Sequence, residues 1–129
     1  MIFIDTNFFL RFFLKDINDQ YLEAKEVFAR GAKGEDVLIT SLVVVFEVFW
    51  VLNSYYHYSR DQVSKTIKNM LSMTFIQITE RQLLVKALNL YDKTGLSLGD
   101  CYNLTFAKLE KVNNFSTFDS ELLKKFESH

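Results

Sequence analysis

Short apolar runs alternate along this chain with segments in which apolar residues recur every three or four positions. Runs of a few apolar residues, bounded by polar ones, predict buried strands. These runs span residues 2–4, 37–39, 75–78 and, more briefly, 115–117. The segments between them predict helices over residues 8–14, 20–32, 41–55, 59–72, 79–94 and 97–111, with a last one from 119 onward. Strands separated by helices indicate an α/β fold in which a parallel sheet lies between helical layers.

Polar residues at the starts of several predicted helices support these boundaries. Ser97 and Asp100 stand three positions apart, as do Thr79 and Gln82, which is the spacing of a capping box. Gly95 is placed to end the helix that precedes Ser97.

Length and composition narrow the class of protein. A chain of 129 residues without proline and with four glycines has no linker-like stretch, so we expect one domain over residues 1–129. The formal net charge of −1 means that any nucleic-acid partner must be met by a local basic patch. Cys101 is the only cysteine, which fits a reducing compartment. The longest apolar run, 42–52, contains a glutamate and is far shorter than the ~20 residues of a membrane span, so we expect a soluble cytoplasmic protein with no membrane partner.

Asp5 directly follows the first apolar run. That run lacks polar alternation, which predicts a central parallel strand covered on both faces. Ligands of open α/β sheets gather just beyond the carboxyl ends of such strands, where Asp5 falls. The alternative is that Asp5 only caps the helix that follows.

Glu47 is the only charge in the predicted helix over residues 41–55. This helix is expected to be buried nearly all round, so an ionised Glu47 would need a cation, an ion-pair partner or a proton. The structural alternative is a buried pair with an arginine or a lysine, for which Arg11 is the obvious candidate.

Asp100 and Asp119 each stand at the start of a predicted helix, and simple capping explains either one alone. The predicted topology nevertheless brings Asp5, Glu47, Asp100 and Asp119 toward one rim of the sheet. Carboxylates that meet there would repel each other unless a hard cation such as Mg²⁺ or Mn²⁺ joined them. Such a cluster suits phosphodiester hydrolysis.

The order and approximate spacing of four motifs resemble those of PIN-domain ribonucleases, most of all the VapC toxins of toxin–antitoxin pairs. The motifs are Ile4-Asp5-Thr6-Asn7, the mid-helix Glu47, Ser97-Leu98-Gly99-Asp100 and Ser116-Thr117-Phe118-Asp119. The resemblance covers essentially the whole chain. It implies a three-layer fold with a parallel sheet of four or five strands, of which the C-terminal fifth is short or missing because the chain ends soon after its last helix. Cys101 stands where the family often has alanine.

The resemblance also implies a function. Asp5, Glu47, Asp100 and Asp119 would hold one or two Mg²⁺ or Mn²⁺ ions and would be the catalytic residues of an endoribonuclease. The residues expected to support them are Thr6, Asn7, Ser116 and Thr117. Arg11 is the cation expected nearest the RNA, whereas most other lysines and arginines are expected on solvated helix faces. The implied partners are the RNA substrate, a cognate antitoxin protein and a second subunit.

Two other functions fit parts of the pattern. One is a catalytically silent PIN-like interaction module, which the heavy load of thirteen phenylalanines and six tyrosines would suit. The other is a receiver-like Mg²⁺-binding signalling domain, which requires an aspartate at the end of the third strand, where the chain has Ile76-Gln77-Ile78. A metal-free ribonuclease with two histidines is disfavoured, because only His57, in a polar loop, and the terminal His129 are present. The RNA target, the number of metals, the antitoxin and the choice between growth arrest and RNA processing are not specified by the sequence.

Overall fold

A computed structural model describes residues 1–128, so His129 lies outside the described residues. The chain forms two compact units, the first spanning Met1–Arg81 and the second beginning at Gln82. Each is described by itself below. Within residues 1–128, no helix has both the length and the apolar character needed to cross a membrane.

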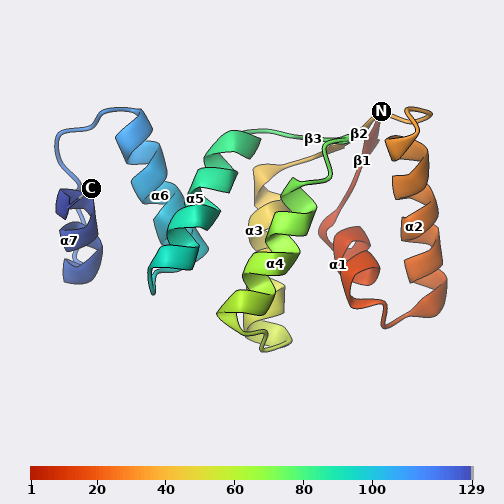
Figure 1. The fold of residues 1–129 in the computed structure, drawn as a ribbon, viewed down its shortest axis with the longest axis horizontal. Coiled ribbons are helices and arrows are strands. Elements are labelled where there is room, and N and C mark those ends of the chain that lie inside the picture. The colour runs from red at the N-terminus through yellow and green to blue at the C-terminus, as the bar shows by residue number, and fades with distance from the viewer. Residues whose placement is uncertain (129) are drawn as a thin grey trace. The chain divides into compact units, whose positions relative to one another are not determined.

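Unit 1 contains a parallel three-stranded sheet together with helices (Figure 1). Its elements are β1 (Ile2–Phe3), α1 (Thr6–Leu14), α2 (Asn18–Ala32), β2 (Leu38–Thr40), α3 (Leu42–Trp50), the π-helix η1 (Val51–Tyr55), α4 (Arg60–Leu71) and β3 (Ile76–Ile78). The strand order is β1-β2-β3, with Phe3 opposite Ile39 and Ile39 opposite Gln77. The predicted α/β class with a parallel sheet flanked by helices is therefore confirmed.

The position of β1 differs from the prediction of a covered central strand. In the sheet of unit 1 the central strand is β2, and β1 lies at the edge. Ile2 and Phe3 are 38% and 55% exposed, whereas Ile4 is 2% exposed. An apolar run without polar alternation shows that a strand is hydrophobic, but it does not determine the place of the strand in the sheet.

Aromatic packing joins α1 to α2 on one side of unit 1. Phe9, with no exposed surface, lies with its ring centroid 5.5 Å from that of Phe28, and the ring of Phe12 meets Phe28 edge-on at 5.0 Å. Gly31 brings α2 close to the sheet, because a Cβ there would stand 2.4 Å from Leu38 Cδ1. These three rings therefore pack α1 against α2 within this unit.

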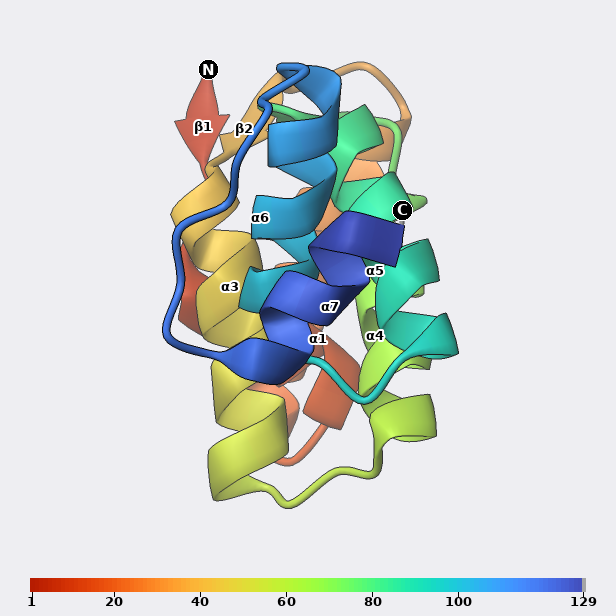
Figure 2. The ribbon, with the colours of Figure 1, turned by 90° about the vertical axis from the view of Figure 1, so that its left-hand side faces the viewer.

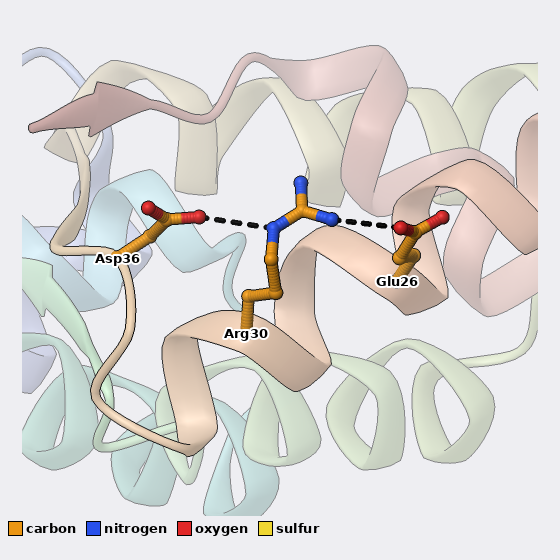
Figure 3. A network of polar contacts seen from close by, with 3 residues as sticks. All are labelled: Glu26, Arg30 and Asp36. Carbon is orange, nitrogen blue, oxygen red and sulfur yellow. Dashed lines mark hydrogen bonds and ion pairs between the residues drawn. The ribbon is translucent and has the colours of Figure 1, made fainter.

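A polar network fixes the end of α2 to the loop before β2 (Figure 3). Arg30 Nε donates to Asp36 at 3.0 Å, and Arg30 Nη1 donates to Glu26 at 2.9 Å. The hydrogen bond to Asp36 is the main reason that the pKa of Arg30 is raised above its ordinary value. Arg30 thus stays charged and holds the turn that leads into the central strand.

A second arginine, Arg81, bonds to main-chain carbonyls before the third strand of unit 1. The Arg81 guanidinium donates to the main-chain carbonyls of Leu71, Met73 and Ile76. Partial burial lowers the pKa of Arg81 below its ordinary value. Its donors satisfy carbonyls in the connection between α4 and β3, which turns the chain into the third strand.

Unit 2 is built from helices. They are α5, which begins at the last residue of unit 1 (Arg81–Lys93), α6 (Leu98–Leu109) and α7 (Ser120–Ser128). Figure 2 shows the connection between α6 and α7 as a long open loop. This loop contains residues 115–117, which were predicted to be a fourth strand and form none in the structure. A three-residue strand exists only when a neighbour pairs with its backbone, and the described residues of unit 2 include no strand that could do so.

Candidate functional site

Asp5 lies at the junction of β1 and α1 and caps that helix. Its backbone is extended (φ −87°, ψ 169°), and its Oδ1 accepts a hydrogen bond from the amide of Thr6 at 2.8 Å. The capping role considered for Asp5 is therefore real. It uses one carboxylate oxygen, and the side chain is exposed. Capping and metal binding by Asp5 are compatible, because Oδ2 has no bonding partner within residues 1–128.

The junction that carries Asp5 is held from β2. The buried hydroxyl of Thr40 donates to the carbonyl oxygen of Ile4 at 2.7 Å, and the amide of Ile4 donates to the carbonyl of Ile39 at 2.8 Å. Ser41, the next residue after β2, caps α3 by accepting from the amide of Val44 at 3.3 Å. Asp5 and Ser41 thus each follow the carboxyl end of one of two paired strands.

Glu47 is exposed, which corrects the prediction of a buried carboxylate. In α3 the buried positions are Val44, Val45 and Val48, while Val43 and Trp50 are 62% and 63% exposed. Glu47 is four residues after Val43 and three before Trp50, so it shares their exposed face. Because both faces of α3 are apolar, the sequence pattern could not reveal which side turns outward.

Arg11 pairs with Asp16 and not with Glu47, so the suggested buried pair is wrong. Arg11 Nη1 lies 3.1 Å from Asp16 Oδ2, and Nη2 donates to the Tyr56 hydroxyl at 3.4 Å. The side chain is only 16% exposed. The assignment of Arg11 to RNA contact stays a prediction.

The two residues that follow Asp5 differ in exposure. Thr6 is buried, and its Oγ1 has no hydrogen-bond partner within the part of the chain that the structure describes. Asn7 is exposed on the first turn of α1. Asp5 is therefore followed along the chain by a buried hydroxyl without a partner and then by an exposed amide side chain.

In unit 2, Asp100 and Asp119 both lie at helix starts. Ser97 Oγ caps α6 by accepting from the amide of Asp100 at 3.1 Å, as predicted, and the Asp100 side chain is half-buried. Asp119 Oδ1 accepts from the amides of Glu121 at 3.0 Å and Leu122 at 3.1 Å. As with Asp5, capping occupies one oxygen of Asp119.

Thr117 supports Asp119 through the backbone. Its hydroxyl accepts from the Asp119 amide at 3.1 Å, while Ser116 is exposed in the preceding loop. Thr117 thus fixes the entry to α7 and does not bond the carboxylate directly.

The side-chain oxygens of these residues are chemically suited to bind a hard divalent cation. All of them are carboxylate, hydroxyl or amide oxygens, which Mg²⁺ and Mn²⁺ prefer, and Thr6 Oγ1 is a buried hydroxyl without a partner. None of the four acids forms an ion pair within the described part of its own unit. Across residues 1–128, no three His, Cys, Asp or Glu side chains form a group able to hold a metal ion. Asp5 and Glu47 belong to unit 1, and Asp100 and Asp119 belong to unit 2.

Thr40 is a residue of the site that sequence reasoning missed. A threonine at the end of an apolar strand is ordinary in a sheet, because β-branched residues are favoured there. The sequence signal that could have found it is a threonine at the end of an apolar strand, because a hydroxyl that becomes buried must find an acceptor. In the structure that acceptor is the carbonyl of Ile4, the residue before Asp5.

Comparison with known proteins identifies one family. The family model described as PIN domain matches residues 2–127. No match is found among curated proteins or among solved structures. The matched range contains all four acids and the residues predicted to support them.

Proposed function

Because this chain belongs to the PIN-domain family, we propose that it is a Mg²⁺- or Mn²⁺-dependent endoribonuclease of the VapC toxin type. PIN domains share a nuclease-like fold, are commonly nucleases and generally bind divalent metals. The proposal adds to this the RNA substrate, the metal requirement and the residues that meet it.

The observation that carries the proposal is that the four acids stand at the motif positions without a neutralising cation in the described part of their own units. Asp5, Glu47, Asp100 and Asp119 occupy the motif positions, and none is neutralised by a cation of its own unit. Asp5 and Asp119 use Oδ1 for capping and keep Oδ2 available. The metal-ligand role is assigned to all four.

Each supporting residue has a defined task in this proposal. Thr6 offers its buried hydroxyl beside Asp5, and Asn7 offers an exposed amide one residue further on. Thr117 holds the backbone of Asp119, and Ser116 precedes it in the same loop. Arg11 is assigned to RNA contact. When bound, the ion supplies charge neutralisation at phosphorus and a more acidic water.

The proposed partners follow from the VapC-type function. They are the RNA substrate, a cognate antitoxin that blocks the site and a second copy of the chain. Two exposed aromatic side chains, Trp50 at 63% and Phe118 at 110%, are consistent with a protein that meets other macromolecules.

The test is RNA cleavage by the purified full chain with Mg²⁺ or Mn²⁺, with EDTA, and with Asp5→Asn beside the wild type. The asparagine oxygen can still accept from the Thr6 amide, so the variant keeps the helix cap while losing the charge. Cleavage is expected to require both metal and Asp5. Asp61→Asn is the matched control, because Asp61 is an exposed acid in the first turn of α4.

Calorimetry with Mg²⁺ or Mn²⁺ completes the test. A folded protein that neither binds these ions nor cleaves RNA would contradict the proposal and favour the silent interaction module. Cleavage that survives in EDTA or in Asp5→Asn would contradict the metal site.

A further inference from the structure

The charges of unit 2 are segregated. Residues 82–129 contain six lysines and six acidic residues, so this part of the chain has no formal net charge. Five of the six lysines line one groove, and none of the six acids does. The five are Lys86, Lys93, Lys108, Lys111 and Lys125. None is ion-paired within the described residues of unit 2.

The groove lies between the three helices of unit 2 and is large. Its volume is about 940 Å³, and its lining comes from α5, α6, the turn after α6 and α7. Lys86, Leu90 and Lys93 are spaced four and three residues apart and so share one face of α5. At a rise of 1.5 Å per residue, Lys86 and Lys93 are separated by roughly 10.5 Å along the helix axis. Positive charge is therefore spread along the groove and not gathered at one point.

Apolar side chains lie between the lysines. Leu83 and Leu104 line the groove and are buried, and the ring of Phe126 lines it from α7. The Phe126 ring is itself held by Phe115, with ring centroids 5.2 Å apart. The surface thus combines an aromatic and apolar floor with a row of cations.

Lys111 adds an independent observation. It has φ +57°, the left-handed conformation that glycine usually supplies at the end of a helix. The amide of Lys111 donates to the carbonyl of Lys108 at 3.1 Å, and the amide of Val112 donates to the carbonyl of Ala107 at 3.1 Å, which is a Schellman motif. The Schellman motif accounts for this conformation, and the Lys111 side chain lines the groove.

We propose that this lysine groove binds a single strand of RNA through its phosphates, with bases against the apolar floor. The inference rests on the proposed nuclease function, for which it names a substrate-holding surface. Separated lysines suit the repeated charges of a polymer better than one small anion. Phe126 and the leucines favour RNA over an acidic peptide, because base faces stack on aromatic and apolar side chains.

The first experiment measures RNA binding by fluorescence anisotropy, using wild-type full-length protein, a labelled single-stranded RNA of mixed sequence and EDTA to prevent cleavage. Lys86→Gln/Lys93→Gln is expected to bind about tenfold more weakly. The slope of log K against log salt should fall by roughly 1.4, since each lost contact to a single strand accounts for about 0.7.

The chain supplies a matched control. Lys124 is the sixth lysine of unit 2, is exposed and does not line the groove, whereas its neighbour Lys125 does. Lys125→Gln should weaken RNA binding and lower the salt slope, and Lys124→Gln should leave both near wild type. Circular dichroism and thermal melting of each variant establish that the fold is retained.

Lys111→Gly separates binding from folding. Glycine adopts the left-handed conformation without strain, so this variant should melt at a higher temperature than the wild type while binding RNA more weakly. A variant that is more stable and binds less cannot owe its weaker binding to damage of the fold.

The outcomes distinguish this inference from the proposed function. Salt-dependent RNA binding that falls with the groove lysines, in a protein that cleaves no RNA, supports the groove and overturns the nuclease. Cleavage and binding that are the same in Lys86→Gln/Lys93→Gln, Lys125→Gln and Lys124→Gln leave the nuclease standing and overturn the groove. A third outcome also overturns the inference. In it, a labelled poly-glutamate probe binds the wild type, the groove variants lose this binding, and RNA does not displace the probe.

Discussion

The hydroxyl of Thr40 donates a 2.7 Å hydrogen bond to the carbonyl oxygen of Ile4, across the pair formed by the first two strands. Thr40 is 1% exposed and ends β2, and Ile4 is 2% exposed and precedes Asp5. The position of the Asp5 carboxylate therefore depends on a side chain of the neighbouring strand. Asp5 is thus held in place by the bond that Thr40 makes to the preceding residue.

Thr40→Val should impair both folding and catalysis. The substitution keeps the branched shape but removes the donor, so the Ile4 carbonyl loses a buried partner at a cost of about 1–3 kcal/mol in unfolding free energy. The displaced Asp5 should lower kcat for RNA cleavage. Urea denaturation and steady-state kinetics measure the two effects.

Thr66→Val is the control for this change. Its hydroxyl donates to Gln62 O at 3.0 Å within α4, a partner that solvent can replace. It should change unfolding free energy and cleavage little. Equal effects of Thr40→Val and Thr66→Val would show that the bond to Ile4 has no special role.

Asp119 allows charge and capping to be separated. Asp119→Asn keeps an oxygen for the amides of Glu121 and Leu122, so its stability should stay near that of the wild type while metal-dependent cleavage is lost. Asp119→Ala loses the cap as well and should be destabilised by about 0.5–2 kcal/mol. Thermal melting and cleavage assays on the two variants test this, and cleavage by Asp119→Asn at the wild-type rate would remove Asp119 from the ligand set.

Gly31 and Gly95 should respond in opposite ways to alanine. A Cβ at Gly31 would stand 2.4 Å from Leu38 Cδ1 and 3.3 Å from the ring of Phe75, so Gly31→Ala forces α2 away from the sheet. We expect a loss of about 1–3 kcal/mol, which the better helix propensity of alanine offsets only in part. At Gly95 no atom lies within 4 Å of the added Cβ, so Gly95→Ala should be neutral or slightly stabilising. Chemical denaturation compares them, and equal stabilities would contradict the packing of α2 on Leu38.

Several helix starts were predictable from local sequence. Ser59 accepts from the Gln62 amide at 3.2 Å, and the Gln62 side chain accepts from the Ser59 amide at 2.9 Å, which is the capping box that such spacing favours. Ser97 caps α6 as predicted. The capping box predicted for Thr79 and Gln82 is wrong, because α5 begins at Arg81 and Glu80 has φ +61°. These signals are local, since the residues that form the bond are three positions apart in the sequence.

Features that depend on distant residues were predicted less well. The apolar pattern through Trp50 continues into η1, where the amide of Tyr56 bonds the carbonyl of Val51, and no periodicity distinguishes this π-turn from an α-helix. The exposure of Glu47 depends on which face of α3 packs inward, and the edge position of β1 depends on which strands pair with it. The third strand and the family fold were predictable, whereas the lysine groove depends on how three helices pack.

Metal binding should stabilise the folded chain, and the size of that effect tests the proposed acids as metal ligands. A ligand that binds only the folded state, at a concentration of 100 times its Kd, adds about 2.7 kcal/mol. Asp5→Asn and Asp100→Asn should each abolish most of the Mg²⁺- or Mn²⁺-induced rise in melting temperature. Asp61→Asn, which changes an exposed acid outside the four motifs, should keep the full metal-induced rise. A full rise in Asp5→Asn or in Asp100→Asn would remove that acid from the ligand set.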